Sequence, residues 1–394
     1  MKAKYAALAL LWPTLPLRAE DRTQGIQTDE QTEPAGFLTE ALNQAVSKAL
    51  TPEAKAGEEE QVEYGRSVSK YMTAPRFGGY IIGSYKYSSQ EGKHNGDGFN
   101  VRNVRMYVSG TVLRDFDYRV QVELSKTVHL KDAYLEWTRV KEARVKLGQF
   151  KRPFTFENPY NPWDVGVGDY SQAVKKLAGF GDYAYNEHNG SNGGRDVGLQ
   201  VQGDILPVGK DGHRLFHYKA GLFNGQGINT GDANSQKDWI GCVQIQPIRD
   251  LYLAFFGWKG NLTAGNVTIH RNRWAVGAKY DHKGWSLRGE YIHNTGHKIS
   301  DYQAATDQWT GRGRADGWYA TLGVPCTEWL KCYVKYDVYR DQGTNASKRT
   351  AWSLAPNFQL HKNLMFQLQY NHVRDRSLTN EHYNEVWGMA YIRF

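Results

Sequence analysis

Basic side chains recur in short groups along the chain, and grouped cations could attract anions. Arg144 and Lys146 alternate with apolar residues, so in an extended segment the two cations would share one face. Lys151 and Arg152 follow at the end of the same segment. Several cationic groups that converge on one constriction would select anions. The candidates for anion binding or for such a constriction are Lys146, Lys151, Arg152, Arg119, Arg144, Lys175, Lys176 and Arg288.

Acidic residues share the face of these cations, so the predicted charged surface is mixed. The same alternation places further bases there, namely Lys219, Arg273, Lys279, Lys331 and Lys335. It also places six acids there: Asp117, Glu123, Asp132, Glu136, Glu290 and Asp337. A single charge on a water-facing wall is usually just solvated. The spacing alone therefore does not show which of the cations converge.

Catalytic signatures are absent from the sequence. It contains no G-x-S-x-G, no H-E-x-x-H and no P-loop. The twelve histidines are scattered, and Glu187-His188 and Glu381-His382 lie in predicted loops without a third ligand at metal spacing. We therefore predict no catalytic residues, no metal site and no cofactor.

The segments that carry the charges have the period of β-strands. Between Phe116 and Ser125, apolar and aromatic residues alternate strictly with polar ones. In a soluble sandwich the apolar face would pack on a second sheet, whereas in a membrane barrel it would face lipid. Sixteen such segments lie near 79–88, 99–110, 115–126, 129–138, 142–150, 195–204, 214–224, 238–247, 250–259, 272–281, 284–294, 316–325, 329–340, 350–360, 363–373 and 383–394.

The length and number of these segments favour the barrel. Most have about ten residues, which is enough for a tilted strand to cross a bilayer. Their number is even, and tight turns alternate with long connections, as in bacterial outer-membrane barrels. We therefore predict an all-β fold, a transmembrane antiparallel β-barrel of 16 strands over residues 76–394.

The N-terminal 75 residues differ from this pattern. Residues 1–19 are typical of a signal peptide; a buried first helix is the alternative, although Pro13 and Pro16 would break it. Residues 20–75 form a predicted acidic, partly helical periplasmic arm, with apolar residues at helical spacing over 36–63. A coiled coil, a plug and a loosely ordered arm all remain open for this segment.

Charge is unevenly divided between these parts. The whole chain has a net charge of +8. Residues 1–19 hold three bases and no acid, and residues 20–75 hold eleven acids and five bases, so residues 76–394 carry +11. In an exported barrel such a charge would attract small anions or acidic lipopolysaccharide rather than nucleic acid.

The C-terminal segment adds an independent indication. Apolar residues alternate from Val386 to Phe394, and the last residue is aromatic. This pattern resembles the signal that the barrel-assembly machinery reads. Trp and Tyr near many segment ends also predict two aromatic girdles at the membrane boundaries.

Two other features leave alternatives open. Residues 151–194 form the longest stretch without strand pattern, and its many aromatic residues favour a loop folded into the lumen over a disordered external loop. Cys326 and Cys332 flank a predicted turn, where a cross-hairpin disulfide and two free thiols are both compatible with the spacing, and Cys242 stands apart.

Several segments resemble one family, the phosphate-selective porins of the O and P type. The most specific is Val145 to Phe154, which resembles the family's lysine–glycine–aromatic–lysine–x–proline–phenylalanine stretch before the constriction loop. Supporting segments lie at 99–110, 131–137, 195–200 and 220–227. The resemblance implies a sixteen-stranded, trimeric barrel that passes anions by diffusion, with Lys151 at the position of the family's loop-entry lysine. Arg152 stands where the family commonly has an acid.

The sequence therefore predicts an outer-membrane porin for small anions, with phosphate or polyphosphate as the candidate solutes. The alternatives are a non-selective general diffusion porin, a structural or adhesive outer-membrane barrel, and a soluble β-sandwich. The predicted partners are outer-membrane lipid and lipopolysaccharide, the barrel-assembly machinery, small anions and two further copies of the chain.

Overall fold

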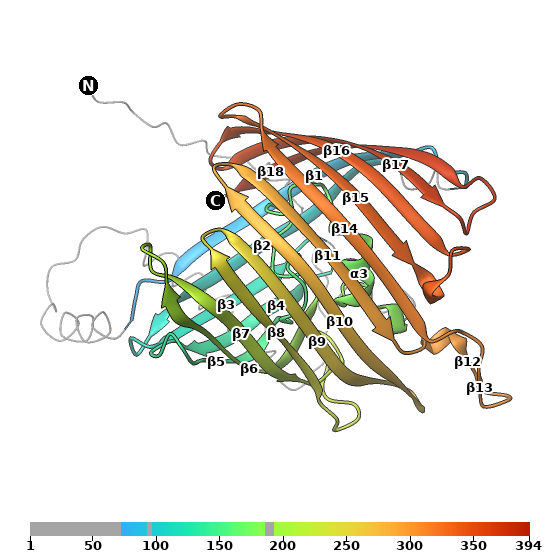
Figure 1. Ribbon diagram of the computed structural model, residues 1–394, viewed down its shortest axis with the longest axis horizontal. Helices are drawn as coiled ribbons and strands as arrows, with labels where there is room; N and C mark the ends of the chain where they lie inside the picture. The colour runs from blue at the N-terminus through green and yellow to red at the C-terminus, as the bar shows by residue number, and fades with distance from the viewer. Residues whose placement is uncertain (1–71, 93–96, 126, 186–192) are drawn as a thin grey trace, which may run out of the picture. The chain divides into compact units, whose positions relative to one another are not determined.

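The computed structural model describes residues 72–92, 97–125, 127–185 and 193–394 (Figure 1). The predicted signal peptide and nearly all of the predicted arm lie outside these residues. No helix in the described part of the chain is long and apolar enough to span a membrane.

Sixteen strands close into one antiparallel barrel, as predicted. They are β1 (Arg76–Ser88), β2 (Gly98–Val112), β3 (Phe116–Glu123), β4 (His129–Trp137), β5 (Arg144–Lys151), β6 (Arg195–Val208), β7 (His213–Phe223), β8 (Asp238–Ile248), β9 (Leu251–Ala264), β10 (Val267–His282), β11 (Trp285–Thr295), β14 (Arg314–Pro325), β15 (Leu330–Arg340), β16 (Lys348–His361), β17 (Leu364–Asp375) and β18 (His382–Arg393). Each strand pairs with its neighbours in sequence, and β18 pairs with β1 to close the ring.

The closure uses the last residue of the chain. The backbone of Phe394 and that of Gly79 exchange two hydrogen bonds, of 2.9 and 3.1 Å. Exposed apolar side chains, such as Leu147 and Phe255, cover the outer face of the barrel. This outward apolar surface is the lipid-facing band that the alternation predicts.

Two connections differ from the prediction. The gap expected at 260–271 is filled by longer strands, because β9 continues to Ala264 and β10 begins at Val267 after a two-residue turn. The stretch 295–315, expected without strands, holds the short helix η3 (Ile299–Asp301) and a two-stranded sheet of β12 (Tyr302–Gln303) and β13 (Gln308–Trp309). A further short helix, η4 (Asp341–Gly343), joins β15 to β16.

Two β-bulges alter the alternation on the inner wall. The register of β1 with β2 passes from Asn103 to Val101 and leaves Arg102 as the extra residue. The register of β3 with β4 passes from Asp132 to Leu130 and leaves Lys131 as the extra residue. A bulge re-aims the side chain of its extra residue. Strict alternation therefore could not assign a face to either cation.

The long connection between β5 and β6, residues 152–194, lies inside the barrel, and we call it the lumen loop. Its described part contains α3 (Gln172–Leu177) and η2 (Tyr183–Tyr185), and Figure 1 shows α3 within the ring of strands. Its backbone accepts from or donates to side chains of β2, β11, β15 and β17, which are spread over half of the ring. The prediction that this stretch folds into the lumen agrees with these contacts.

Candidate functional site

One side of the lumen loop is fixed to the barrel wall by apolar packing. Phe154, Phe156, Val174 and Leu177 are buried against inward residues of strands β7 to β15, including Phe256. The rings of Phe154 and Phe156 meet Phe256 edge-on, at 6.3 and 5.3 Å between centroids. We call this half of the barrel the covered wall, because the loop shields it from water.

A buried carboxylate holds the first turn of the loop. The side chain of Glu290, on β11, accepts hydrogen bonds from the backbone N–H of Phe156 at 2.5 Å and from that of Glu157 at 3.3 Å. The hydroxyl of Tyr319 donates to the same carboxylate at 2.5 Å. Because all these groups are buried, each donor depends on Glu290 for its partner.

A second carboxylate ties the loop to α3 and to two further strands. Glu157 accepts from the backbone N–H of Ser171 at 2.6 Å and pairs with Arg288 at 3.1 Å. Lys335 lies 3.8 Å from both Glu157 and Asp337. Asp337 in turn accepts from the backbone N–H of Gln172, at 2.9 Å. The charges of this cluster therefore balance largely among themselves, out of contact with water.

Three arginines surround the ring of Trp258 in the same half of the barrel. Their guanidinium carbons lie 4.5 to 5.1 Å from the ring centroid. Arg152 pairs with Asp196 at 2.8 Å, and both side chains are fully buried. Arg273 donates to Asp182 at 2.6 Å and to the carbonyl of Leu177, at the end of α3, at 2.7 Å. These arginines fasten the loop and its first residues to the barrel wall through buried ion pairs.

The other side of the loop presents cations to water. Ser171 caps α3, and Lys175 and Lys176 lie in its last turn. Lys175 pairs with Asp169 at 2.7 Å, and Arg102 of β2 pairs with the other oxygen of that carboxylate at 3.2 Å. Burial acts to raise the pKa of Asp169, but Lys175 and Arg102 hold this pKa well below its usual value. Asp169 is therefore ionised under all physiological conditions.

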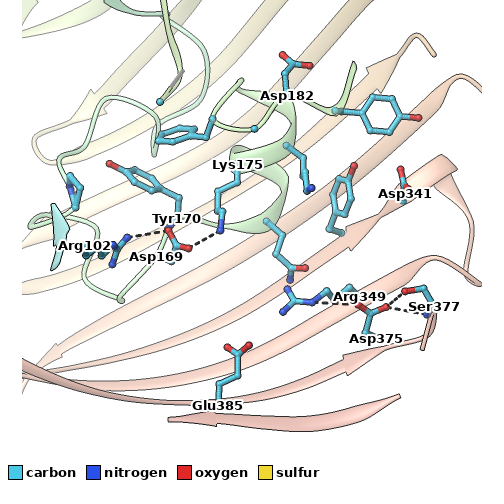
Figure 2. A pocket seen from close by; sticks show the side chains of 18 of the residues that line it. Arg102, Asp169, Tyr170, Lys175, Asp182, Asp341, Arg349, Asp375, Ser377 and Glu385 are labelled. Carbon is cyan, nitrogen blue, oxygen red and sulfur yellow. Dashed lines mark hydrogen bonds and ion pairs between the residues drawn. The ribbon is translucent and has the colours of Figure 1, made fainter. Parts of the chain in front are cut away.

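These residues line a cavity of about 980 Å³, which we call the outer hollow (Figure 2). Figure 2 shows Arg102, Asp169 and Lys175 on one side and Arg349 and Glu385 on the opposite wall. The described lining holds seven bases and five acids; the bases are Arg102, Arg105, Lys131, Lys175, Lys176, Lys298 and Arg349. Most of these bases have an acidic partner within the hollow or beside it.

A second cavity of about 260 Å³ lies beside the first residues of the loop, and we call it the inner hollow. Its described lining holds six bases, Arg119, Lys146, Lys151, Arg152, Arg195 and Lys219, and a single acid, Asp132. Arg195 pairs with Asp132 at 2.7 Å. Lys146 also pairs with Glu136 at 2.9 Å, and Arg152 pairs with Asp196, so the lining has an excess of bases that is partly neutralised from behind.

The two hollows approach each other at the bulge in β4. Lys131 lines the outer hollow, and Asp132, the next residue, lines the inner one. Lys131 interacts electrostatically with Arg105 and Arg195, one from each hollow. Lys151 donates to the carbonyls of Asn158 and Tyr160. The loop entrance therefore concentrates positive charge at this narrow point.

The eight predicted constriction residues fall into three groups. Arg119, Lys146 and Lys151 meet in the inner hollow, and Lys175 and Lys176 meet in the outer hollow. Arg152 touches the inner hollow but is buried in its pair with Asp196. Arg288 is buried behind the lumen loop against Glu157, and Arg144 pairs with Asp204 at the end of the barrel that carries the short turns. Of these eight candidates, five therefore lie together in the two hollows, and Arg152, Arg288 and Arg144 are held in ion pairs.

Seven of the bases that line the two hollows were not among the eight candidates, namely Arg102, Arg105, Lys131, Arg195, Lys219, Lys298 and Arg349; of these, Lys219 was predicted only to face the lumen. Arg102 and Lys131 escaped because they lie on bulges, and Lys298 because it lies in a loop. Arg105 and Arg195 are inward residues of predicted strands, at positions where alternation could have found them. Their contribution depends on distant neighbours, which spacing within one strand does not show.

Comparisons with known proteins agree with this geometry. The family model for phosphate-selective porin O and P matches residues 78–165. This match confirms the resemblance to the family over the segment that runs from β1 into the lumen loop. A search of curated protein sequences found no match to the chain.

Solved structures with the same fold include several outer-membrane channels. An anion-selective porin from Comamonas acidovorans has 13% identity and a TM-score of 0.61, covering 82% of this chain and 99% of that one. The outer-membrane channel DcaP of Acinetobacter baumannii has 13% identity and a TM-score of 0.59, covering 81% and 97%. OmpT of Vibrio cholerae, in a trimer form, has 13% identity and a TM-score of 0.56, covering 82% and 99%.

The closed barrel, the loop within it and these matches define the class of the protein as a porin. The chain is an outer-membrane porin related to the phosphate-selective porin O and P family. The fold and the family point to a channel rather than an enzyme.

Proposed function

We propose that this porin passes small anions, and that they move along the cations of the two hollows. The observation that carries the proposal is the series of bases that lines the two hollows and continues from one to the other near Lys131. Attraction between a small anion and such a series would raise its local concentration in the pore. The proposed path comprises Lys298, Lys176, Lys175, Arg102, Arg105, Lys131, Arg195, Lys151, Arg119, Lys146 and Lys219.

Neighbouring members of this path interact electrostatically. Lys176 interacts with both Lys175 and Lys298 at the outer end. In the middle, Lys151 interacts with Arg195 and Arg105. At the inner end, Lys219 interacts with Lys146. An anion that leaves one cation therefore approaches the next one without crossing an uncharged stretch.

Acids along the path keep each site weak in the outer hollow. Asp169 partly neutralises Arg102 and Lys175, and Asp341 forms an ion pair with Lys298. Conduction requires sites that attract an ion yet release it again. The inner hollow, with its excess of bases, is the place where we expect anions to be held most strongly.

Phosphate is our candidate solute, with polyphosphate as an extended one. The matched family is described as phosphate-selective, and a structural neighbour is described as anion-selective. Arginine and lysine both bind phosphate oxygens, arginine through its planar pair of N–H groups. A row of cations would bind several phosphate groups of one polyphosphate molecule at once.

We also propose that the porin is a homotrimer, since OmpT of Vibrio cholerae is described in a trimer form. The outer face of the barrel carries exposed Leu, Val and Trp side chains, which suit both lipid and neighbouring barrels. Cross-linking in outer membranes would give a band at three times the mass of the chain. A single-chain band alone would contradict the trimer.

Planar-bilayer conductance tests the proposed selectivity. The purified porin is studied in a KCl gradient, and phosphate is then added at constant ionic strength. We expect a reversal potential of the sign that anion flow gives and a phosphate-dependent fall of the chloride current. A current without ion preference would support a general diffusion porin instead, and the absence of conductance would support a structural or adhesive barrel.

A further inference from the structure

Two thiols lie together at the turn between β14 and β15. The backbone N–H of Cys326 donates to the carbonyl of Leu330 at 2.9 Å, so these two residues face each other across the hairpin. In the adjoining register, Val324 pairs with Cys332. Cys326 therefore lies diagonally across the hairpin from Cys332. The two thiols lie close enough to interact electrostatically, and the thiol of Cys326 also donates to the carbonyl of Val324 at 3.6 Å.

Both side chains point to the outer face of the barrel. Leu330, Cys332 and Val334 alternate with inward residues along β15, and Val334 is exposed on the outside. Cys326 is exposed and Cys332 is half-buried. Because Cys326 lies in the turn, beyond the end of β14, redox reagents and proteins can reach the pair from the water at that end of the barrel without entering the pore.

The third cysteine is separated from this pair. Cys242, on β8, is buried in the apolar cluster beneath the lumen loop, together with Phe256 and Ile240. It has no route to Cys326 or Cys332, and it provides an internal reference for thiol labelling.

The position of the turn determines the redox surroundings of the pair. In outer-membrane barrels the short turns lie on the periplasmic side, and the turn from Cys326 to Trp329 is short. The bacterial periplasm is kept oxidising, and exported proteins acquire disulfides there. A disulfide also requires two cysteines on the same face with Cα atoms no more than about 7 Å apart. Diagonal neighbours of a hairpin share a face at about 7–8 Å, so the bond would draw the two strand ends slightly together.

We propose that Cys326 and Cys332 form an intramolecular disulfide in the periplasm, by exchange with the disulfide of a thiol oxidoreductase. One thiolate attacks the donor disulfide and forms a mixed disulfide, and one donor sulfur leaves as a thiolate. The second cysteine then attacks the mixed disulfide, which forms the Cys326–Cys332 bond and releases the donor's second sulfur. The two cysteines lose two protons and two electrons, and the donor disulfide becomes a dithiol.

The bond would close a short ring across the turn and join the ends of β14 and β15. These two strands carry Tyr319, Lys335 and Asp337, which anchor the lumen loop from the covered wall. Because the pair faces away from the lumen, the disulfide would act on the stability of this hairpin and leave conduction unchanged.

Intact-mass analysis with thiol labelling tests the proposal. The porin is extracted from outer membranes into denaturant that contains N-ethylmaleimide and no reductant. We expect one adduct, on Cys242, before reduction and three adducts after reduction. Three adducts before reduction would overturn the proposal, as would a disulfide-linked dimer on a non-reducing gel.

Single-cysteine variants assign the adducts. Cys242→Ser should give no adduct before reduction, and Cys332→Ser should give two. The double variant with both Cys326 and Cys332 replaced by serine should conduct like the wild type. Labelling of Cys326 by N-ethylmaleimide in the unreduced wild-type protein would also overturn the proposed pairing, whatever effect the serine substitutions have on stability.

Discussion

Arg273 and Arg349 both point from a strand into the barrel, yet their surroundings are opposite. Arg273 lies under the lumen loop, where Asp182 and the carbonyl of Leu177 occupy its donors. Arg349 faces the outer hollow, across from the loop (Figure 2). The covered wall, which contains Arg273, is shielded from water by apolar packing, and its charges are balanced in ion pairs. We call the other half of the barrel, which contains Arg349, the open wall, because its cations remain in contact with water.

This difference shows that the number of basic residues does not define the pore. Buried cations such as Arg152 and Arg288 are neutralised by partners at hydrogen-bonding distance and fix the loop. Their charges are compensated before an ion arrives. Cations on the open wall act on ions instead, because they remain in contact with water even where Asp169, Asp341 or Asp375 pairs with them. The covered wall thus determines the position of the lumen loop, and the open wall determines the ion selectivity of the pore.

The largest expected effect concerns the covered wall. Glu290→Ala would leave the N–H of Phe156 and the hydroxyl of Tyr319 without their acceptor, and we expect the free energy of unfolding to fall by about 3 kcal/mol. Urea unfolding in detergent, followed by tryptophan fluorescence, measures the change. Glu381→Ala, which removes an exposed carboxylate paired with Arg374, is the control and should have little effect. Equal stability of the two variants would contradict the anchoring role.

The next effect concerns the open wall. Lys131→Glu reverses a charge between the two hollows, and we expect the anion-to-cation permeability ratio to fall about fivefold, from a change of about 1 kcal/mol. Reversal potentials in a KCl gradient measure the ratio. Lys362→Glu, on an exposed turn, makes the same change in net charge. If both variants shift the ratio equally, the position of Lys131 has no special importance.

A smaller effect should appear with pH. Burial, together with Lys175 and Lys298, lowers the pKa of Lys176 to about 8. Lys176 is therefore mostly charged at pH 7 and mostly neutral at pH 9, so anion preference should fall by about twofold over this range. Lys176→Arg stays charged and should lessen the fall. An identical pH profile in the two proteins would show that Lys176 does not act on the ions.

The smallest effect is expected at the barrel end. Arg144 pairs with Asp204 at 2.9 Å, and about a third of each side chain is exposed. Arg144→Gln should change the free energy of unfolding by less than about 1 kcal/mol and should leave the reversal potential unchanged. A loss of selectivity comparable to that of Lys131→Glu would extend the selective region to this rim.

The sequence could predict the barrel because alternation, strand length and the even strand number are local properties that the membrane imposes. The sixteen segments, including 350–360 with Pro356, all form strands. The lumen loop was also foreseen from its length and its aromatic residues. Its anchors were not, because the contact between Glu290 and Phe156 joins residues far apart in the chain.

The site was predicted less completely, for two physical reasons. Bulges at Arg102 and Lys131 break the alternation that assigns a face to each side chain. Burial beneath the loop then separates Lys151 from Arg152, although the two bases are adjacent in sequence. Neither property can be obtained from spacing, since both depend on how the loop packs inside the ring.

A comparison of Lys151 with Arg152 therefore tests most directly whether the selectivity depends on the cations of the open wall alone. Lys151→Gln and Arg152→Gln remove the same charge one residue apart, and the glutamine at 152 can still donate to Asp196. Reversal potentials in a KCl gradient should show a clear loss of anion preference for Lys151→Gln and none for Arg152→Gln. An equal loss in both variants would contradict the claim that only the cations of the open wall select anions.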